Sequence, residues 1–165
     1  MTKKLLLLVV ACIMTLSASA QFQKGKGYVG ASLTGLNLHY NGNDKFTLGL
    51  QAQGGYFIAD NLMLLGEASF EHSSNDAVAD RYTLGVGGRY YLDSCGLFFG
   101  AAAKLVHCDH NHNDVMPSIE VGYAFFVNRS VTIEPAIYYD QSFTSHKNYS
   151  TIGLRVGVGI YLFDD

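Results

Sequence analysis

Apolar residues alternate with small or polar residues along the chain from Lys45 to Phe163. Between Phe46 and Gln53 every even-numbered residue is apolar and every odd-numbered residue is small or polar. Alternation with a period of two, in segments of about 10 residues separated by turn signals, is typical of a transmembrane β-barrel. In such a barrel the apolar series of each strand faces outward, and the other series faces the interior.

Turn residues divide this pattern into eight segments. Tight turns are expected at residues 59–61, 93–96 and 128–130, and longer polar connections at residues 73–80, 108–115 and 144–149. Short periplasmic turns that alternate with longer external loops are the pattern of outer-membrane barrels. The sequence therefore predicts an all-β fold, an eight-stranded antiparallel up-and-down transmembrane β-barrel. The apolar parity of the first segment changes near Thr34, which predicts a bulge or kink. The predicted strands are residues 26–39, 45–58, 62–72, 81–92, 97–107, 116–127, 131–143 and 150–163.

Six charged residues in the interiors of the strands lie on the inward-facing parity. They are Glu67, Arg89, Lys104, Glu120, Glu134 and Arg155. The interior of an eight-stranded barrel is only wide enough to be filled by side chains, and buried charges must pair. We therefore expect an internal salt-bridge network that plugs the lumen. Equal distances from the centres of the connecting loops predict two cross-strand pairs, Lys104 with Glu120 and Glu67 with Arg89.

Aromatic residues gather near the ends of the predicted strands. This distribution is typical of the aromatic girdles at the two membrane interfaces of a barrel. The predicted periplasmic girdle is Tyr56, Tyr90, Phe99 and Phe125, and the external one is Tyr40, Phe46, Phe70, Tyr82 and Tyr139.

The first 20 residues have the pattern of an export signal. Lys3 and Lys4 give a positive start, residues 5–16 form a short apolar core, and residues 18–20 form a small-residue cleavage site. The apolar run is shorter than the about 20 residues that a spanning helix needs. We assign residues 1–20 to a cleavable signal peptide and residues 21–165 to the barrel domain. In an alternative interpretation residues 9–12 are a lipobox, and Cys12 is lipidated instead of removed.

The composition agrees with a membrane protein and excludes some partners. Charged residues make up 15% of the chain, against about 25% in soluble domains. Without Lys3 and Lys4 the chain has nine basic and 14 acidic residues, a net charge of −5, so no basic nucleic-acid surface is predicted. Cys95 and Cys108 fall at opposite ends of one predicted strand, and an intramolecular disulfide is therefore not expected.

The chain resembles a known family of membrane proteins. The signal that ends Ala18-Ser19-Ala20-Gln21, the eight alternating segments and the closing segment 153–163 resemble the small eight-stranded outer-membrane proteins of Gram-negative bacteria, which include the OmpX and OmpA-barrel types. The resemblance implies a location in the outer membrane, contact with its lipids and lipopolysaccharide, and assembly by the outer-membrane insertion machinery. It also implies a non-enzymatic role, either structural or in surface interaction such as adhesion or contact with a host protein.

One external loop concentrates metal-ligating side chains. They are His107, Cys108, Asp109, His110 and His112. Imidazole, thiolate and carboxylate are ligands that suit Zn²⁺ or another transition metal. No standard zinc-motif spacing is present. The loop is therefore either a metal site or a solvated polar loop without a cofactor.

Two further functions are compatible with particular features of the sequence. The run from Glu71 to Asn75 resembles the active-site strand of outer-membrane lipid A deacylases, in which a serine, a histidine and an acid cleave an acyl ester, and His72 and Ser74 share a strand face here. This resemblance implies a lipid A-modifying hydrolase. The same alternation would also suit a soluble secreted calyx-type barrel that turns its apolar face inward and binds a small lipophile.

Overall fold

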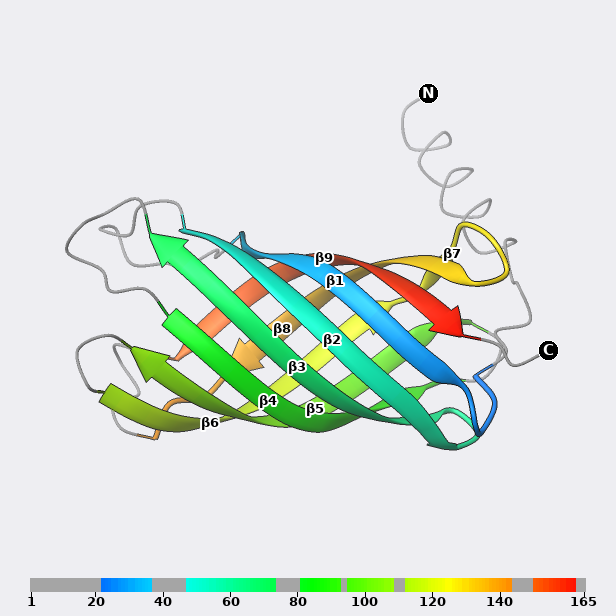
Figure 1. Ribbon diagram of the computed structural model, residues 1–165, viewed down its shortest axis with the longest axis horizontal. Helices are drawn as coiled ribbons and strands as arrows, with labels where there is room; N and C mark the ends of the chain where they lie inside the picture. Colours follow the sequence, from blue (N-terminus) through cyan, green and yellow to red (C-terminus); the bar gives the residue numbers. More distant parts are fainter. Residues whose placement is uncertain are drawn as a thin grey trace, which may run out of the picture.

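The fold is a closed β-barrel. The computed structural model describes residues 22–36, 47–73, 81–92, 95–108, 112–143 and 150–162. Within these residues, strand segments form one antiparallel sheet whose strands run obliquely around the molecule (Figure 1). The bounds are β1 Gly27–Leu36, β2 Thr47–Ala59, β3 Leu62–Ser73, β4 Arg81–Tyr91, β5 Leu97–Cys108, β6 His112–Tyr123, β7 Phe125–Phe126, β8 Val131–Asp140 and β9 Thr151–Leu162.

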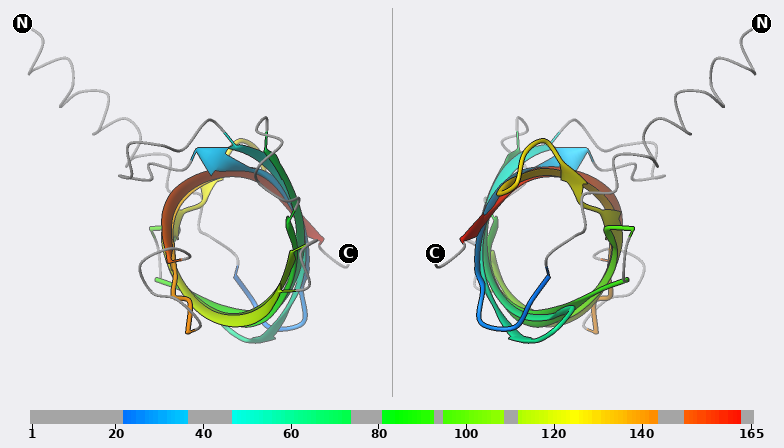
Figure 2. Two further views of the ribbon diagram at one scale, coloured as in Figure 1. Left: turned by 90° about the vertical axis from the view of Figure 1, so that its left-hand side faces the viewer. Right: turned by 90° about the vertical axis from the view of Figure 1, so that its right-hand side faces the viewer.

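The sheet closes on itself because β8 pairs with both β6 and β7. Consecutive strands are neighbours, and β9 pairs with β1, so the strands form the ring seen in Figure 2. β6 and β7 are two parts of one barrel strand that is interrupted at Ala124. The interruption lies beside Pro135 of β8, which has no backbone N–H to donate to the ladder. The predicted eight-stranded antiparallel barrel is confirmed.

Within the described residues, two strand ends differ from the prediction by three residues or more. β6 begins at His112, not at residue 116, because Cys108 and His112 are already paired across the hairpin. The predicted connection of residues 108–115 is thus mostly strand, and the prediction was wrong there. β8 ends at Asp140, three residues earlier than predicted. The bulge predicted near Thr34 is confirmed, since the register between β1 and β9 shifts between Leu33 and Leu36.

The apolar series of the strands faces outward. Leu84, Val86 and Leu105 expose 63%, 70% and 60% of their surface, whereas Phe57 and Tyr91, of the opposite parity, are buried. The calyx-type alternative requires the reverse orientation and is therefore wrong. Among the residues described, no helix is long and apolar enough to cross a membrane.

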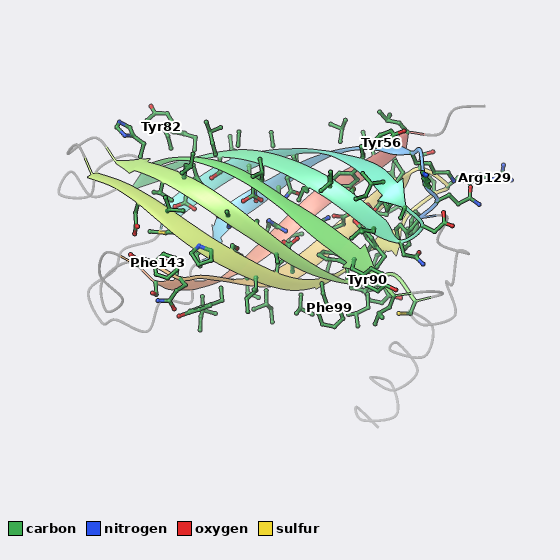
Figure 3. All side chains as sticks on the ribbon, turned by 90° about the horizontal axis from the view of Figure 1, so that it is seen from below. Tyr56, Tyr82, Tyr90, Phe99, Arg129 and Phe143 are labelled. Atoms are coloured by element: carbon green, nitrogen blue, oxygen red, sulfur yellow. The ribbon has the colours of Figure 1, made fainter. Side chains whose placement is uncertain are left out.

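Aromatic side chains lie at both ends of the outer wall. The ends at which β2 meets β3, β4 meets β5 and β7 meets β8 lie on one side of the barrel, which we call the short-turn end, and the opposite end is the long-loop end. Tyr56, Tyr90 and Phe99 lie towards the short-turn end, as Arg129 does, whereas Tyr82 and Phe143 lie at the long-loop end (Figure 3). The predicted girdle residues Tyr40 and Phe46 lie outside the described residues.

Two of the tight turns depend on a left-handed backbone residue. Asn61, between β2 and β3, has φ of 65° and Gly96, before β5, has φ of 76°. Asparagine and glycine are the residues that adopt this conformation most readily. A Cβ at Gly96 would also lie 2.8 Å from the carbonyl oxygen of Ala124, and the Gly96 carbonyl accepts the Ala124 N–H at 2.8 Å.

We predict that Gly96→Ala destabilises the barrel by about 1–2 kcal/mol, because an L-residue resists this φ and its Cβ crowds the Ala124 carbonyl. Urea unfolding of the protein in lipid vesicles measures the change. Gly54→Ala is the matched control, since a Cβ at Gly54 meets nothing within 4 Å. Equal stability of the two variants would contradict this account of the turn.

Candidate functional site in the barrel interior

The barrel interior contains charged and hydroxyl side chains between two ends of different character. An aromatic cluster fills the short-turn end, and polar pairs occupy the long-loop end. The six charges expected in the lumen lie between them and point inward, each from a different strand of the ring. Ion pairs and hydrogen bonds join them into one network.

Arg89 of β4 is the centre of this network. Its side chain is 0% exposed. The guanidinium donates from Nε to Glu120 Oε1 at 2.9 Å and from Nη1 to Glu134 Oε2 at 3.0 Å. The same group lies 4.2 Å from the centre of the Phe98 ring, a cation–π distance. One buried cation thus neutralises carboxylates from two other strands, and its planar donors fix their positions.

Arg155 of β9 holds the second oxygen of Glu120. Its Nη2 pairs with Glu120 Oε2, and its Nη1 donates to Gln51 Oε1 at 3.0 Å. The Glu120 carboxylate is therefore held between two guanidinium groups. Since β4, β6 and β9 supply these three side chains, the interaction ties together strands that are not neighbours in the sheet.

Glu134 of β8 accepts hydrogen bonds from hydroxyl groups as well as from Arg89. The Tyr28 hydroxyl donates to Oε2 at 2.8 Å, and those of Tyr161 and Thr132 donate to Oε1 at 3.0 and 2.8 Å. A carboxylate with this many donors is well compensated for the loss of water. The tyrosines also join the charged network to the aromatic cluster beneath it.

Lys104 of β5 forms the part of the network nearest the long-loop end. Its Nζ lies 2.9 and 3.1 Å from the Asp140 carboxylate oxygens and 3.5 Å from Glu67 Oε1. Glu67 Oε2 accepts from the side-chain amides of Gln51 and Gln53 at 2.7 and 3.3 Å. Lys104 therefore pairs with two acids. Gln51, which contacts both Glu67 and Arg155, connects these pairs to the rest of the network.

Neither of the two predicted charge pairs is present. Lys104 is opposite Met116, and Glu120 is opposite Gly100; Glu67 is opposite Gly85. In both hairpins the observed partner lies four residues earlier in the chain than the predicted one, Met116 in place of Glu120 and Gly85 in place of Arg89. The inward charges also reach across the lumen to strands other than their neighbours, and sequence spacing within one hairpin does not report such contacts.

Phe22 closes the short-turn end. It is 2% exposed, and its ring stacks on Tyr91 with 3.9 Å between centroids. The segment before β1 is fixed by its backbone, since Phe22 O accepts Asn61 N–H at 2.7 Å and Gly25 N–H donates to Phe57 O at 2.8 Å. The blue start of the described chain accordingly lies inside the ring in Figure 2. Phe22 and its segment therefore form a stopper.

The packed interior leaves very little free space. Two interior cavities bounded by described residues have volumes of about 10 and 20 Å³. A cavity needs about 10–15 Å³ to hold one water molecule. Each cavity therefore holds at most a single water, and neither is a binding pocket for a larger ligand.

Several interior residues were not identified from the sequence. Phe22 precedes the first strand, and no periodic signal marks it. Asp140 lies on the inward parity of β8 but near the end of the predicted strand, where a solvated carboxylate is the usual expectation. Gln51 and Gln53 were correctly placed inward, yet only their contacts with Glu67 show that they belong to the charged network.

The donor-rich hairpin is only partly described. His107 is exposed, and the backbone pairs His107 with Asn113 and Cys108 with His112. Asp109 and His110 lie outside the described residues. No group of three or more His, Cys, Asp or Glu side chains close enough for a metal is found in the described part of the chain. Metal binding at this hairpin therefore stays a prediction. Cys95, which lies outside the hairpin, has an exposed free thiol.

Comparison with known proteins identifies the class of fold. No protein-family model matches the chain, and no curated protein sequence matches it. Its solved structural neighbours include small eight-stranded outer-membrane β-barrels, and the chain is structurally similar to that class.

Individual neighbours match most of this chain and nearly all of their own. Neisserial surface protein A has a TM-score of 0.65 at 15% identity over 83% of this chain and 99% of its own. The N-terminal barrel of Pseudomonas aeruginosa OprF has a TM-score of 0.63 at 14% identity, over 84% of this chain and 98% of its own. Ail, the attachment invasion locus protein of Yersinia pestis, has a TM-score of 0.51 at 11% identity, over 85% of this chain and 100% of its own. At these identities the likeness establishes the fold alone.

We predict that Arg89→Met destabilises the barrel by about 3–5 kcal/mol, because it leaves two buried carboxylates without their shared cation. Equilibrium unfolding by urea in lipid vesicles measures this loss. The control is Arg129→Met at an exposed turn position, which should change stability by no more than about 0.5 kcal/mol. Similar values for the two variants would show that Arg89 is not central to the network.

We predict that Phe22→Ala lowers the free energy of unfolding by about 3 kcal/mol, the lower end of the range for truncating a buried phenylalanine. It should also reduce the near-ultraviolet circular dichroism of the stacked rings. Val127→Ala is the control, since Val127 is 63% exposed. Retention of both the stability and the dichroism in Phe22→Ala would contradict the stopper.

Proposed function

We propose that this chain is an integral outer-membrane β-barrel protein with a plugged interior, whose role is structural or lies in interactions at the cell surface. The observation that carries the proposal is the combination of an apolar outer wall with a charged, filled interior. A protein in water places these groups the other way round. In a bilayer this arrangement gives the lipid an apolar surface to contact and keeps the charges paired with one another inside the barrel.

The exposed apolar side chains support insertion in a bilayer. Residues such as Leu50, Val86 and Ile119 expose 63%, 70% and 61% of their surface around the ring. A continuous apolar belt of this kind far exceeds the isolated patches found on soluble monomers. Ring closure removes every open strand edge, which is the condition for β-structure in hydrocarbon.

The packed lumen supports a non-conducting barrel. Arg89, Lys104 and Arg155 each hold at least one acid across the lumen, and the two interior cavities bounded by described residues have volumes of only about 10 and 20 Å³. A hydrated ion needs a continuous aqueous path, as in the wider porins. The six-charge network is therefore proposed as a structural plug.

An interaction at the cell surface is the functional part of the proposal. Short turns at one end match the periplasmic side of outer-membrane barrels, which supports an external position for the long-loop end. One structural neighbour, Ail, is the attachment invasion locus protein of Yersinia pestis. Proposed contacts of this chain are outer-membrane lipids and lipopolysaccharide, the insertion machinery, and an external protein or host surface at the loops.

Two residue groups at the long-loop end give secondary proposals. The 107–112 hairpin would bind Zn²⁺ if its donors converge. The 71–75 run would act in lipid A hydrolysis if its serine and histidine meet, although Ser74 and Asn75 lie outside the described residues. No contact among the described residues supports either proposal, and the structural or surface-interaction role is favoured.

We expect the folded protein in the membrane fraction to migrate differently on a detergent gel before and after boiling, because a closed barrel resists detergent until it is heated. Reconstituted in planar bilayers, it should show no stable large conductance. A soluble protein without a mobility shift would refute membrane insertion. A stable open channel would refute the plug but leave the barrel intact.

A further inference from the structure

Lys104 and Asp140 form a buried contact between two strands that are not neighbours in the ring. Lys104 lies on β5 and Asp140 ends β8, and β6 lies between these strands in the sheet. Nζ of Lys104 lies 2.9 Å from Asp140 Oδ1 and 3.1 Å from Oδ2, and each side chain is 9% exposed. The two nearly equal distances place the amine nitrogen opposite the carboxyl carbon, Cγ.

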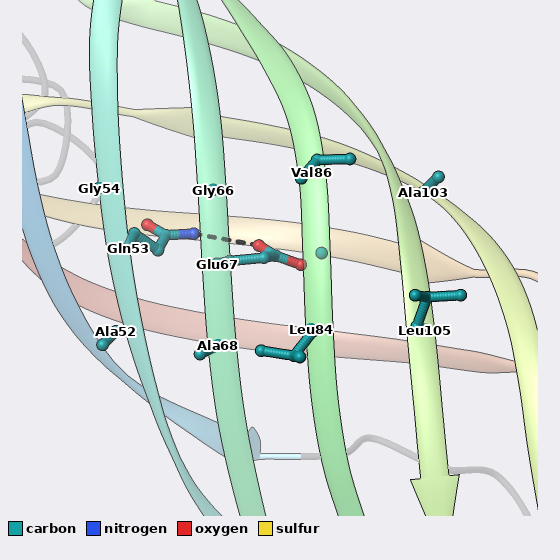
Figure 4. A pocket seen from close by; sticks show the side chains of 11 residues that line it. Ala52, Gln53, Gly54, Gly66, Glu67, Ala68, Leu84, Val86, Ala103 and Leu105 are labelled. Carbon is teal, nitrogen blue, oxygen red and sulfur yellow. Dashed lines mark hydrogen bonds between the residues drawn. The ribbon is translucent and has the colours of Figure 1, made fainter.

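A second carboxylate faces the same nitrogen. Glu67 of β3 has a side chain that is 6% exposed, and its Oε1 lies 3.5 Å from Lys104 Nζ. Oε2 accepts from the side-chain amides of Gln51 and Gln53, whereas the buried Oε1 accepts no hydrogen bond from the described residues. Figure 4 shows the Gln53 amide directed at one oxygen of Glu67, while the other oxygen is turned away from it.

A carboxylate oxygen without a donor is unusual in this interior. Both oxygens of Glu120 are held by arginines, and both oxygens of Glu134 accept hydrogen bonds. A buried polar atom without a partner costs free energy and calls for an explanation. A plug alone does not explain it, because a donor at Glu67 Oε1 would make the plug more stable. A free lone pair beside an amine is instead what a proton acceptor for that amine provides.

We propose that Lys104 and Asp140 join in an isopeptide bond inside the folded barrel, with Glu67 as the acid–base group of the reaction. A lysine amine is a nucleophile once it has lost its proton. Groups held in near-attack contact react at effective molarities of up to about 10⁵–10⁸ M. Formation of the amide also removes two buried charges, which are costly to keep away from water.

The reaction needs no partner other than these three side chains. Glu67 Oε1 takes a proton from Lys104 Nζ, and the electron pair of Nζ then attacks Cγ of Asp140. One Cγ–O bond breaks, and the departing oxygen takes up two protons that began on Nζ and that Glu67 delivers. The products are a neutral amide and one water molecule, and Glu67 returns to its starting carboxylate. No group is oxidised or reduced.

The interior has room for the water that leaves. The cavity of about 20 Å³ is lined by Lys104 and Asp140, together with the hydroxyl residues Ser69 and Thr83, and such a volume holds a single water molecule. The ring of Tyr138 lies over the amine, with its centre 5.1 Å from Nζ. The packed surroundings exclude bulk water from the reacting groups, which strengthens the electrostatic interactions among them.

The bond fixes the part of the ring nearest the long-loop end. It joins residues 36 positions apart in the chain and makes β5, β6 and β8 one covalently closed unit. A covalent link restricts the unfolded chain, as a disulfide does, and so favours the folded barrel. This inference goes beyond the proposed membrane location and plug, which both stand without it.

The test follows the intact mass of residues 21–165 after refolding from urea into detergent micelles. The wild-type chain should begin at full mass and lose the mass of one water molecule as it folds. Trypsin should then release residues 90–129 joined to residues 130–147, with cleavage after Lys104 blocked. Glu67→Gln keeps the shape of the acid but cannot accept the proton. Its rate of linkage should be lower by about tenfold or more, since a general acid–base group contributes about 10²–10⁴-fold.

Two further variants test the assignment. Glu134→Gln is the matched control, because it changes another buried acid of the network, one that contacts Arg89 rather than Lys104. It should form the bond at the wild-type rate. Lys104→Arg has no amine that can form the amide and should stay at full mass. The heat-dependent gel shift of each variant shows that it has folded.

The outcomes separate this inference from the proposed function. A folded wild-type barrel that keeps its full mass and gives only separate tryptic peptides overturns the bond and leaves an ion pair in the plug. Loss of water from Lys104→Arg assigns the change in mass to another group and also overturns the bond. Equal rates in the wild-type protein and Glu67→Gln overturn the role of Glu67. A wild-type protein without the gel shift refutes the proposed membrane barrel instead.

Discussion

A ring of eight strands encloses too little room for bulk water, so its inward charges must be solvated by the protein itself. Arg89 meets this requirement by pairing with Glu120 and Glu134 at once. The positions of other interior residues follow from this requirement. Hydroxyl groups of Tyr28 and Tyr161 complete the shell of Glu134, and glycines lie where a side chain would strike a glutamate. The lumen is therefore a packed polar core.

The alternation of the sequence was enough to predict the ring and its two faces. A period of two fixes which side chains share a face, and one apolar series per strand decides which face meets lipid. The bulge after Leu33 was also visible, as a change of parity. These features are local, so a single strand carries the signal for each.

The contacts within the lumen were not predictable in the same way. Glu120 faces Arg155 from a strand far along the chain, and Lys104 finds Asp140 rather than Glu120. Such partners depend on the stagger between strands and on the diameter of the closed ring. Neither quantity can be inferred from the sequence of a single hairpin. Phe22 belongs to no periodic segment at all, and only its depth within the ring shows its role.

The stopper also constrains the order in which the barrel assembles. Phe22 contacts Tyr91 of β4 and Tyr161 of β9, so its pocket is complete only after the last strand has joined the first. Contacts between residues so distant in the sequence form late, because the chain must first lose the entropy of closing the intervening loop. The residue at the beginning of the described chain is therefore among the last to settle, and its burial coincides with closure of the ring.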